Sequence, residues 1–177
     1  MAGAKDGKEI LRLELGGGLK PKEGFINIDI DPNADVVMNL DREHLPYEDA
    51  TVSEVYSSHC LEHLDNVWHT IHEICRVCKV GAKVTIKVPH YNNPMAMCPG
   101  HRHVISELMV NHFKEFPEMW KGRERKLVER GLIRRPSSFF AEARSLKCYL
   151  EMTDDQIMKF VSGTCHESEF IFTVESV

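Results

Sequence analysis

Three consecutive glycines occupy positions 16–18, between two short apolar segments that residues 11–15 and 25–31 form. Such a run costs backbone entropy, and it is typical of a turn with positive φ or of a ligand that lies against bare backbone. Asp29 and Asp31 end the second segment, where carboxylates can accept the two hydroxyls of a ribose. The residue types and their spacing therefore indicate a site for a nucleotide cofactor.

The glycine loop differs from the two best-known phosphate loops. A dinucleotide fold needs G-x-G-x-x-G, with the acidic residue about 20 positions further on. Here Pro21 stands in the place of the third glycine, and Asp29 lies only 11 residues after Gly18. The lysine and serine that directly follow the last glycine of a P-loop are also absent, because Leu19 follows Gly18. The pattern thus favours a cofactor with a ribose and without a pyrophosphate.

Two histidines follow later strand patterns and are candidates for acid-base chemistry. His63 lies near the head of a helical pattern that follows residues 52–56, and His90 comes directly after residues 83–88. Ligands bind at the carboxyl ends of strands in open α/β sheets, where a histidine can act as a general base. The alternative for each is a surface or capping histidine.

Cysteines and histidines also raise the question of a metal. The C-x-x-C of Cys75 and Cys78 lies on the apolar stripe of a predicted helix, so we expect both thiols in the core. Cys98, His101 and His103 lie in a long loop and are better metal candidates, with zinc as the alternative to our prediction of no metal site.

The surrounding elements follow from hydrophobic periodicity. Period-2 and short apolar runs predict strands, and one amphipathic pattern over residues 61–78 predicts a helix. Further predicted helices span 105–113 and 124–132; the predicted strands are 11–15, 25–30, 34–40, 52–56, 83–88, 139–150 and 169–177. This order predicts an α/β fold with a Rossmann-like, mostly parallel sheet of about seven strands, flanked by helices and closed by an antiparallel pair.

The connection after the glycines is unusually short. Parallel neighbouring strands normally need a crossover of a dozen residues or more. Only residues 19–24 separate the glycines from the second segment. Either the crossover helix is reduced to a turn, or the first two strands are not parallel neighbours.

Length and composition describe an ordinary globular chain. With 177 residues, 42% of them hydrophobic and 28% charged, we expect one domain, whose residues 1–90 hold the predicted cofactor site. The N-terminus lacks the apolar region of a signal peptide, and no apolar run approaches the roughly 18 residues of a membrane span. We therefore expect a cytoplasmic protein without a membrane partner.

The net charge of -5 conceals a basic segment at residues 121–135, which holds seven basic and two acidic residues. Such a segment can meet a phosphate or nucleic acid, but it is more often a solvated face. A nucleic-acid partner is therefore a minor alternative.

Five motifs in order resemble the class I S-adenosylmethionine-dependent methyltransferases, in particular the compact branch with an abbreviated first helix. They are LELGGG, GFINIDIDP, LDREHLPYED, VYSSHCLEHL and CRVCKVGAKVTIKVP, and they cover roughly the first half of the chain. Two departures are the turn of Val80, Gly81 and Ala82, where the family has proline-glycine-glycine, and the third consecutive glycine.

The resemblance implies a cofactor site and its roles. Glu14 would meet the methionine end of S-adenosylmethionine, Asp29 its ribose and Asp41 its adenine amino group. The implied cofactor-binding residues are Glu14, Gly16, Gly17, Gly18, Asp29, Asp41, Ser58 and His59.

The function implied by the resemblance is methyl transfer to an unidentified small acceptor, for which an anionic molecule is one candidate. The resemblance also implies that residues 1–90 form the cofactor-binding half and residues 91–177 the acceptor side. The alternatives are a binding module that kept the fold and lost turnover, and a nucleic-acid methylase that uses residues 121–135. The sequence leaves the acceptor and the oligomeric state open.

Overall fold

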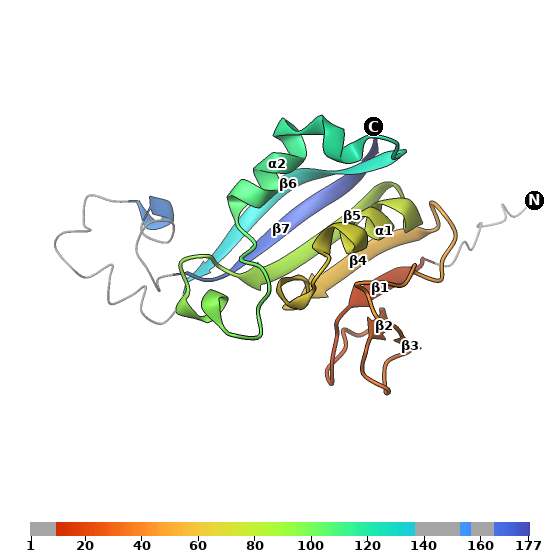
Figure 1. Cartoon of the computed structure of the whole chain (residues 1–177), viewed down its shortest axis with the longest axis horizontal. Coiled ribbons are helices and arrows are strands. Elements are labelled where there is room, and N and C mark those ends of the chain that lie inside the picture. Colours follow the sequence, from red (N-terminus) through yellow and green to blue (C-terminus); the bar gives the residue numbers. More distant parts are fainter. Residues whose placement is uncertain (1–9, 137–152, 157–164) are drawn as a thin grey trace, which may run out of the picture.

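The computed structural model describes residues 10–136, 153–156 and 165–177. Within them, seven strands form one sheet in the order β3-β2-β1-β4-β5-β7-β6 (Figure 1). The strands are β1 (Arg12–Leu15), β2 (Ile26–Asp29), β3 (Val36–Val37), β4 (Val52–Ser58), β5 (Cys78–Pro89), β6 (Arg125–Pro136) and β7 (Cys165–Ser176). Strands β1 to β5 pair in parallel, whereas β7 is antiparallel to both β5 and β6. The predicted α/β fold with its closing antiparallel pair is confirmed.

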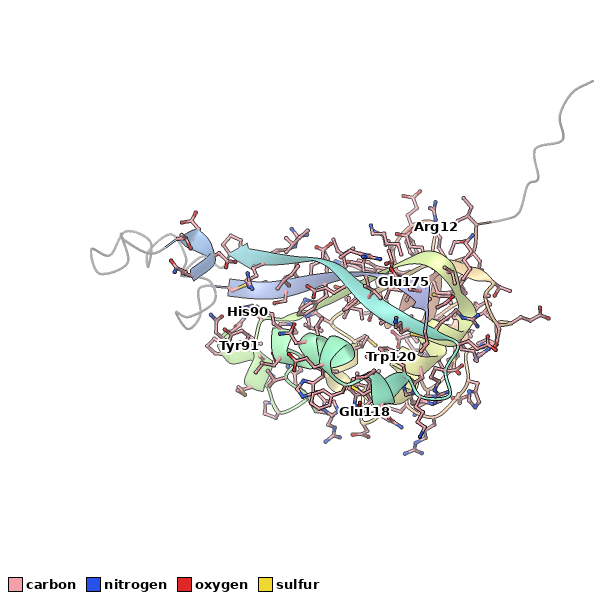
Figure 2. The ribbon with its side chains drawn as sticks, turned by 90° about the horizontal axis from the view of Figure 1, so that it is seen from above. Arg12, His90, Tyr91, Glu118, Trp120 and Glu175 are labelled. Carbon is pink, nitrogen blue, oxygen red and sulfur yellow. The ribbon has the colours of Figure 1, made fainter. Side chains whose placement is uncertain are left out.

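The described helices cover one face of this sheet. They are η1 (Leu61–His63), α1 (Val67–Val77), η2 (Pro94–Met97), α2 (Glu107–Glu115) and η3 (Pro117–Trp120). Figure 2 shows α2, and η3 with Trp120, along one side of β6 and β7. Ile71 of α1 and Val110 of α2 border the same small cavity as Phe170 and Phe172 of β7, so both helices pack on the same face. No helix in the described part of the chain has the length and apolar character to cross a membrane.

Side chains alternate between the two faces of each strand, and the apolar ones gather on the face that the described helices cover. Phe170, Phe172 and Val174 of β7 point to the helices and are almost completely buried. Each such side chain contributes about 1.5–3 kcal/mol by leaving water. The opposite face carries charged residues such as Lys87, whose Nζ lies 3.6 Å from a carboxylate oxygen of Glu169. A face of this kind tolerates water and leaves the core between the sheet and the helices.

The short connection between β1 and β2 is a series of turns. The two strands are parallel neighbours, with Leu13 opposite Ile26 and Leu15 opposite Ile28. Gly16 N donates to Ile28 O at 2.8 Å. Two side chains accept backbone N–H groups of the connection: Glu14 from Lys22 N, and Asn27 from Gly17 N. These bonds replace the crossover helix, which resolves the alternatives left open by the sequence.

The helical pattern at residues 61–78 divides into two elements. After η1, the side chain of Asn66 accepts the backbone N–H of His69 at 3.2 Å and begins α1. Helix α1 ends at Val77, and Cys78 already belongs to β5. Burial raises the pKa of Cys78 to about 12, and Cys75 is equally enclosed. The predicted core role of both cysteines is confirmed.

Two predicted elements differ from the structure. The predicted helix at 124–132 is wrong, because these residues belong to β6, whose Leu127 pairs with Val174 in the period-2 pattern of a strand. The predicted strand at 34–40 shrinks to Val36–Val37. The strand predicted at 139–150 lies outside the described residues.

The basic segment at 121–135 is largely this strand, and its arginines have internal partners. Arg125 donates to the carbonyl oxygens of Cys75 and Arg76, both at 2.9 Å. Arg134 pairs with Glu107 through two hydrogen bonds. These arginines thus stabilise the fold, whereas the sequence alone predicted that their charges face solvent or a ligand.

Candidate functional site

A pocket of about 300 Å³ opens at the carboxyl ends of the parallel strands. This volume falls at the lower end of the roughly 300–1,000 Å³ that is typical of small-molecule sites. Its position matches the rule that ligands of open α/β sheets bind beyond the carboxyl ends of the strands. The lining residues are Gly16, Asp29, Ile30, Met38, Asn39, Leu40, Asp41, His59, Cys60, His63 and Leu64.

The glycine loop has no room for larger residues at two of its positions. Gly16 has a φ of +71°, and a Cβ there would collide with the side chain of Cys60. A Cβ at Gly17 would lie 2.5 Å from Asn27 Oδ1 and 2.8 Å from Glu14 Oε2. Gly18 has open space around it, but its φ of +55° is in the left-handed region. Each of the three positions therefore requires glycine for a physical reason of its own.

Two carboxylates lie in the pocket and keep acceptor capacity. Asp29 accepts hydrogen bonds from Gly18 N at 2.8 Å and from Asp31 N at 3.0 Å. Asp41 accepts one from Asn66 N at 2.8 Å. A carboxylate offers about four lone-pair sites, so both side chains can accept further hydrogen bonds. The structure thus brings together the two acidic residues that the sequence assigned to a nucleoside.

An apolar wall completes the pocket beside these carboxylates. Met38, Leu40 and Leu64 are at least nine-tenths buried, and they present their edges to the cavity. Ile30 is 72% exposed at the same pocket. Apolar groups around a few polar ones are typical of small-molecule sites.

His59 and Cys60 enter the pocket from the end of β4. His59 has a φ of +54°, a conformation that costs a non-glycine residue about 1–3 kcal/mol and that clusters at functional sites. A hydrogen bond with Glu62, joined by one with Glu167, raises the pKa of His59. Burial raises the pKa of Cys60 to about 12, so its thiol stays protonated.

Other predicted cofactor residues lie outside the pocket lining. Glu14 is 5% exposed and supports the glycine loop through its bond from Lys22 N. Ser58, at the last position of β4, pairs with Lys87 across the sheet and does not border the pocket, although the next residue does. The predicted contacts of Glu14, Gly17, Gly18 and Ser58 with a cofactor stay predictions.

The two candidate bases are in different surroundings. His63 lines the pocket, and its Nδ1 lies 3.0 Å from Gly100 O. His90 is completely buried, and burial lowers its pKa. Figure 2 shows His90 with Tyr91 at the end of the sheet far from Arg12 and Glu175. Both follow strand ends as predicted, but only His63 lines the pocket.

Sequence reasoning missed the segment after β3 as part of the site. Met38, Asn39 and Leu40 were assigned to a strand, yet they turn into the pocket after only two strand residues. The Asx-type bond of Asn39 Oδ1 with Asp41 N, at 2.9 Å, is the local signal for this turn.

The segment 19–86 matches the family model described as a methyltransferase domain. A comparison with curated proteins returned no match. Among solved structures, an S-adenosylmethionine-dependent methyltransferase from Mesorhizobium loti has a TM-score of 0.57 at 10% identity, covering 93% of this chain and 90% of that one. One from Archaeoglobus fulgidus has a TM-score of 0.56 at 14% identity, covering 94% and 87%.

A third similar structure contains the demethylated cofactor. It is geranyl diphosphate C-methyltransferase from Streptomyces coelicolor, in complex with S-adenosyl-L-homocysteine. Its TM-score is 0.50 at 12% identity, and the alignment covers 94% of this chain and 71% of that one. Together, the matching segment and the similar structures show that the chain has the fold of S-adenosylmethionine-dependent methyltransferases, as its motifs predicted.

Proposed function

We propose that the protein binds S-adenosylmethionine and transfers its methyl group to a small-molecule acceptor. The observation that carries this proposal is the pocket in which Gly16, Asp29 and Asp41 meet at the ends of β1, β2 and the segment after β3. The matched family model and the cofactor in the related geranyl diphosphate enzyme support the same ligand.

The residues present fit such a cofactor. The glycine loop lets a ligand approach bare backbone, since a Cβ has no room at Gly16 or Gly17. Asp29 and Asp41 form no ion pair within the described residues, so their remaining lone pairs can accept from ribose hydroxyls and an adenine amino group. The apolar wall suits the faces of an adenine ring.

For methyl transfer, the main contribution of the protein is to orient the cofactor and the acceptor. When bound, the cofactor supplies a methyl group on a sulfonium, and in-line displacement breaks the carbon–sulfur bond and leaves a neutral thioether. Asp29 and Asp41 would fix the nucleoside, and much of the rate enhancement comes from such positioning. His63 lies at the same pocket and would accept a proton from the acceptor.

We further propose that the acceptor approaches from the part of the chain after β5. There, a second pocket of about 600 Å³ lies between the η2 segment and α2. Tyr91, Met97, Val104 and Leu108 give it a largely apolar lining. A pocket of this size would hold a small molecule, in keeping with the expected division into a cofactor half and an acceptor half.

Calorimetry with S-adenosylmethionine and S-adenosylhomocysteine tests the cofactor proposal. We expect Asp29→Ala to weaken binding by about 1–3 kcal/mol, because ribose hydroxyls lose their acceptor. Asp31→Ala is the matched control, since Asp31 ends the same strand pattern but bonds Asn33 and does not line the pocket. Absence of binding by the wild type near millimolar ligand would overturn the proposal. Equal affinity of Asp29→Ala and wild type would show that another group holds the ribose.

A further inference from the structure

Glu62, His63 and His101 converge beside the proposed cofactor pocket. One donor atom from each of the three side chains lies within 4.8 Å of the other two. Glu62 and His63 come from η1, and His101 comes from the loop that follows η2. Among the described residues, this is the cluster of three histidine, cysteine or acidic side chains with spacing suited to a metal ion.

Glu62 has an acceptor that the protein leaves unused. Its side chain is 1% exposed, and Oε1 lies 3.2 Å from His59 Nδ1. Within the described part of the chain, Oε2 is buried and has no hydrogen-bond partner. Buried charges in proteins are paired or coordinate metals, because an unsatisfied carboxylate oxygen is costly. Glu62 is paired with His59 through Oε1, and its Oε2 is left available to coordinate a cation at this position.

The hydrogen bonds of the two histidines leave a ligand atom free on each ring. His63 Nδ1 lies 3.0 Å from Gly100 O, and His101 Nδ1 lies 3.3 Å from Ala96 O. A carbonyl oxygen only accepts, so Nδ1 must be the protonated nitrogen of each ring. In a neutral imidazole, Nε2 then carries the lone pair. A backbone carbonyl that orients a ring in this way is the usual support of a metal-binding histidine.

The loop that carries His101 is attached to η1. Arg102 N donates to Glu62 O at 2.7 Å, and His103 N donates to the same oxygen at 3.2 Å. The rings of His63 and His101 meet edge to face, with centroids 4.7 Å apart. These contacts hold the three side chains together without help from a ligand.

We propose that Glu62, His63 and His101 bind one divalent transition metal ion. Two imidazoles and one carboxylate form a donor set that Zn²⁺ and its neighbours in the first row accept, and three protein ligands leave open coordination positions. Ligand atoms about 2.0–2.2 Å from one ion lie at most roughly 4.4 Å apart. The spread of up to 4.8 Å thus requires only a small inward movement of these side chains.

The position of this ion defines the acceptor class, a step that rests on the proposed function. His63 also lines the cofactor pocket, so the open coordination positions adjoin the place where methyl transfer would occur. A divalent ion binds hydroxyl oxygen and lowers its pKa. With its Nε2 lone pair on the ion, His63 would be a metal ligand in place of a base. A hydroxyl acceptor would release its proton to water and bond the methyl carbon through oxygen, while the electron pair of the broken carbon–sulfur bond stays on sulfur. The site therefore favours O-methylation.

Metal binding without cofactor or acceptor tests the site directly. Apo protein is titrated with Zn²⁺ in a competition assay and with Co²⁺ by visible absorption. We expect one ion per chain in the wild type. His63→Ala and His101→Ala should weaken binding by more than roughly 100-fold, beyond the 10–100-fold that loss of an outer partner costs. Glu62→Gln should act in the same direction.

Two matched variants distinguish this site from a metal site formed by Cys98, His101 and His103 of the loop alone. Cys98→Ser and His103→Ala change the other two candidates that the sequence offered, and we expect both to bind like the wild type. His103 Nε2 lies 3.4 Å from Asp65 O, outside the cluster. Circular dichroism checks that each variant folds. Loss of binding in Cys98→Ser with retention in His63→Ala would overturn the proposal, as would a wild type that binds no ion.

Calorimetry with S-adenosylhomocysteine on the same preparations separates the two proposals. Cofactor binding by a wild type that takes up no Zn²⁺ would overturn the metal site alone. Zn²⁺ binding without cofactor binding would overturn the proposed function and the acceptor class, and would leave the metal site supported.

Discussion

The two ends of the sheet are built from strands of very different length. Strands β1, β2 and β3 have 4, 4 and 2 residues, whereas β5, β6 and β7 have 12 each (Figure 1). The short strands leave much of their chain in loops, and these loops form the pocket. The residues of the long strands form ladder hydrogen bonds and contribute side chains to the core. One end of the sheet thus contributes to the pocket, and the other contributes most of the strand pairing.

Charged residues follow the same division. At the short-strand end, Asp29 and Asp41 accept backbone N–H groups and keep lone pairs for a ligand. At the long-strand end, Arg135 pairs with Glu167 and Glu169. Charge that has a partner contributes to the fold, and charge that keeps free capacity is available for binding. Substitutions at the two ends should therefore separate affinity from stability.

The largest effect is expected at Gly16, where the fold and the pocket both require glycine. Gly16→Ala should lower the free energy of unfolding by about 2–5 kcal/mol, combining a left-handed cost of about 1–2 kcal/mol with overpacking of about 1–3 kcal/mol against Cys60. Urea denaturation gives this value, and calorimetry with S-adenosylhomocysteine gives the accompanying loss of affinity.

Gly81→Ala is the control for Gly16→Ala. Gly81 has a φ of +84°, with open space around the position of a Cβ. It should lose only the left-handed cost of about 1–2 kcal/mol and keep its affinity for the cofactor. If both variants lose the same stability, the contact with Cys60 is not the reason for glycine at position 16.

The next effect concerns a paired charge on α1. Glu73 accepts hydrogen bonds from Arg76 and from Leu45 N, and so attaches the loop before β4 to the helix. Glu73→Gln should lower the free energy of unfolding by about 1–3 kcal/mol, because Arg76 loses the more buried of its two ionic partners and keeps only Asp49. Cofactor affinity should stay unchanged. A loss of affinity as large as the loss of stability would break the division between the two kinds of charge.

The same carboxylate predicts a pH dependence. Burial raises the pKa of Glu73, but bonds from Arg76, His44 and Leu45 N outweigh it and lower the pKa to about 2 from its ordinary 4.5. A carboxyl group with a lower pKa in the folded state stabilises the fold above its unfolded pKa. The stability difference between wild type and Glu73→Gln should therefore be full above pH 4.5 and shrink as the pH falls to 2. Urea denaturation across this range measures it; a constant difference would contradict the assignment.

The ligand-binding end was more predictable from sequence than the rest. Glycines, strand-end carboxylates and prolines are local signals, so the loop at Gly16 and the place of Asp29 beside it could be predicted from spacing. The family resemblance added Asp41, and the cofactor roles of both carboxylates stay predictions. For the connection between β1 and β2, the sequence offered a crossover reduced to a turn as one of two alternatives, but it could not decide between them. Its bonds come from Glu14 and Asn27, whose side chains face the loop only after the strands have paired.

The other end depends on pairing that spacing does not encode. Residues 124–132 carry a charge pattern that resembles a helix, and only the ladder with β7 makes them a strand. Beside the pocket, the amphipathic pattern of residues 61–78 predicts Glu62 on the polar side of a helix, yet Glu62 is 1% exposed, and the loop with Arg102 and His103 is bonded to its backbone oxygen. A contact between distant segments decided each of these cases.

Arg125 tests the stabilising role of the basic segment. Arg125→Met keeps the apolar stem but removes the bonds to Cys75 O and Arg76 O at the end of α1. We expect a loss of about 1–2 kcal/mol in the free energy of unfolding, with unchanged cofactor affinity. Lys126→Met, in the same strand, is the matched control. Salt-dependent nucleic-acid binding that both variants lose would instead assign the segment to a nucleic-acid ligand.

The smallest effect tests whether free acceptor capacity alone marks the ligand-binding end. Asp41→Asn keeps an oxygen for Asn66 N but removes the charge and replaces one acceptor by a donor. An adenine amino group would then lose its partner, so affinity for S-adenosylhomocysteine should fall by about 0.5–1.5 kcal/mol while stability barely changes. Asp31→Asn, which leaves the pocket lining intact, should bind like the wild type. If Asp41→Asn loses stability and not affinity, its bond to the start of α1 matters more than its place in the pocket, and the division of charges between the two ends does not hold at this residue.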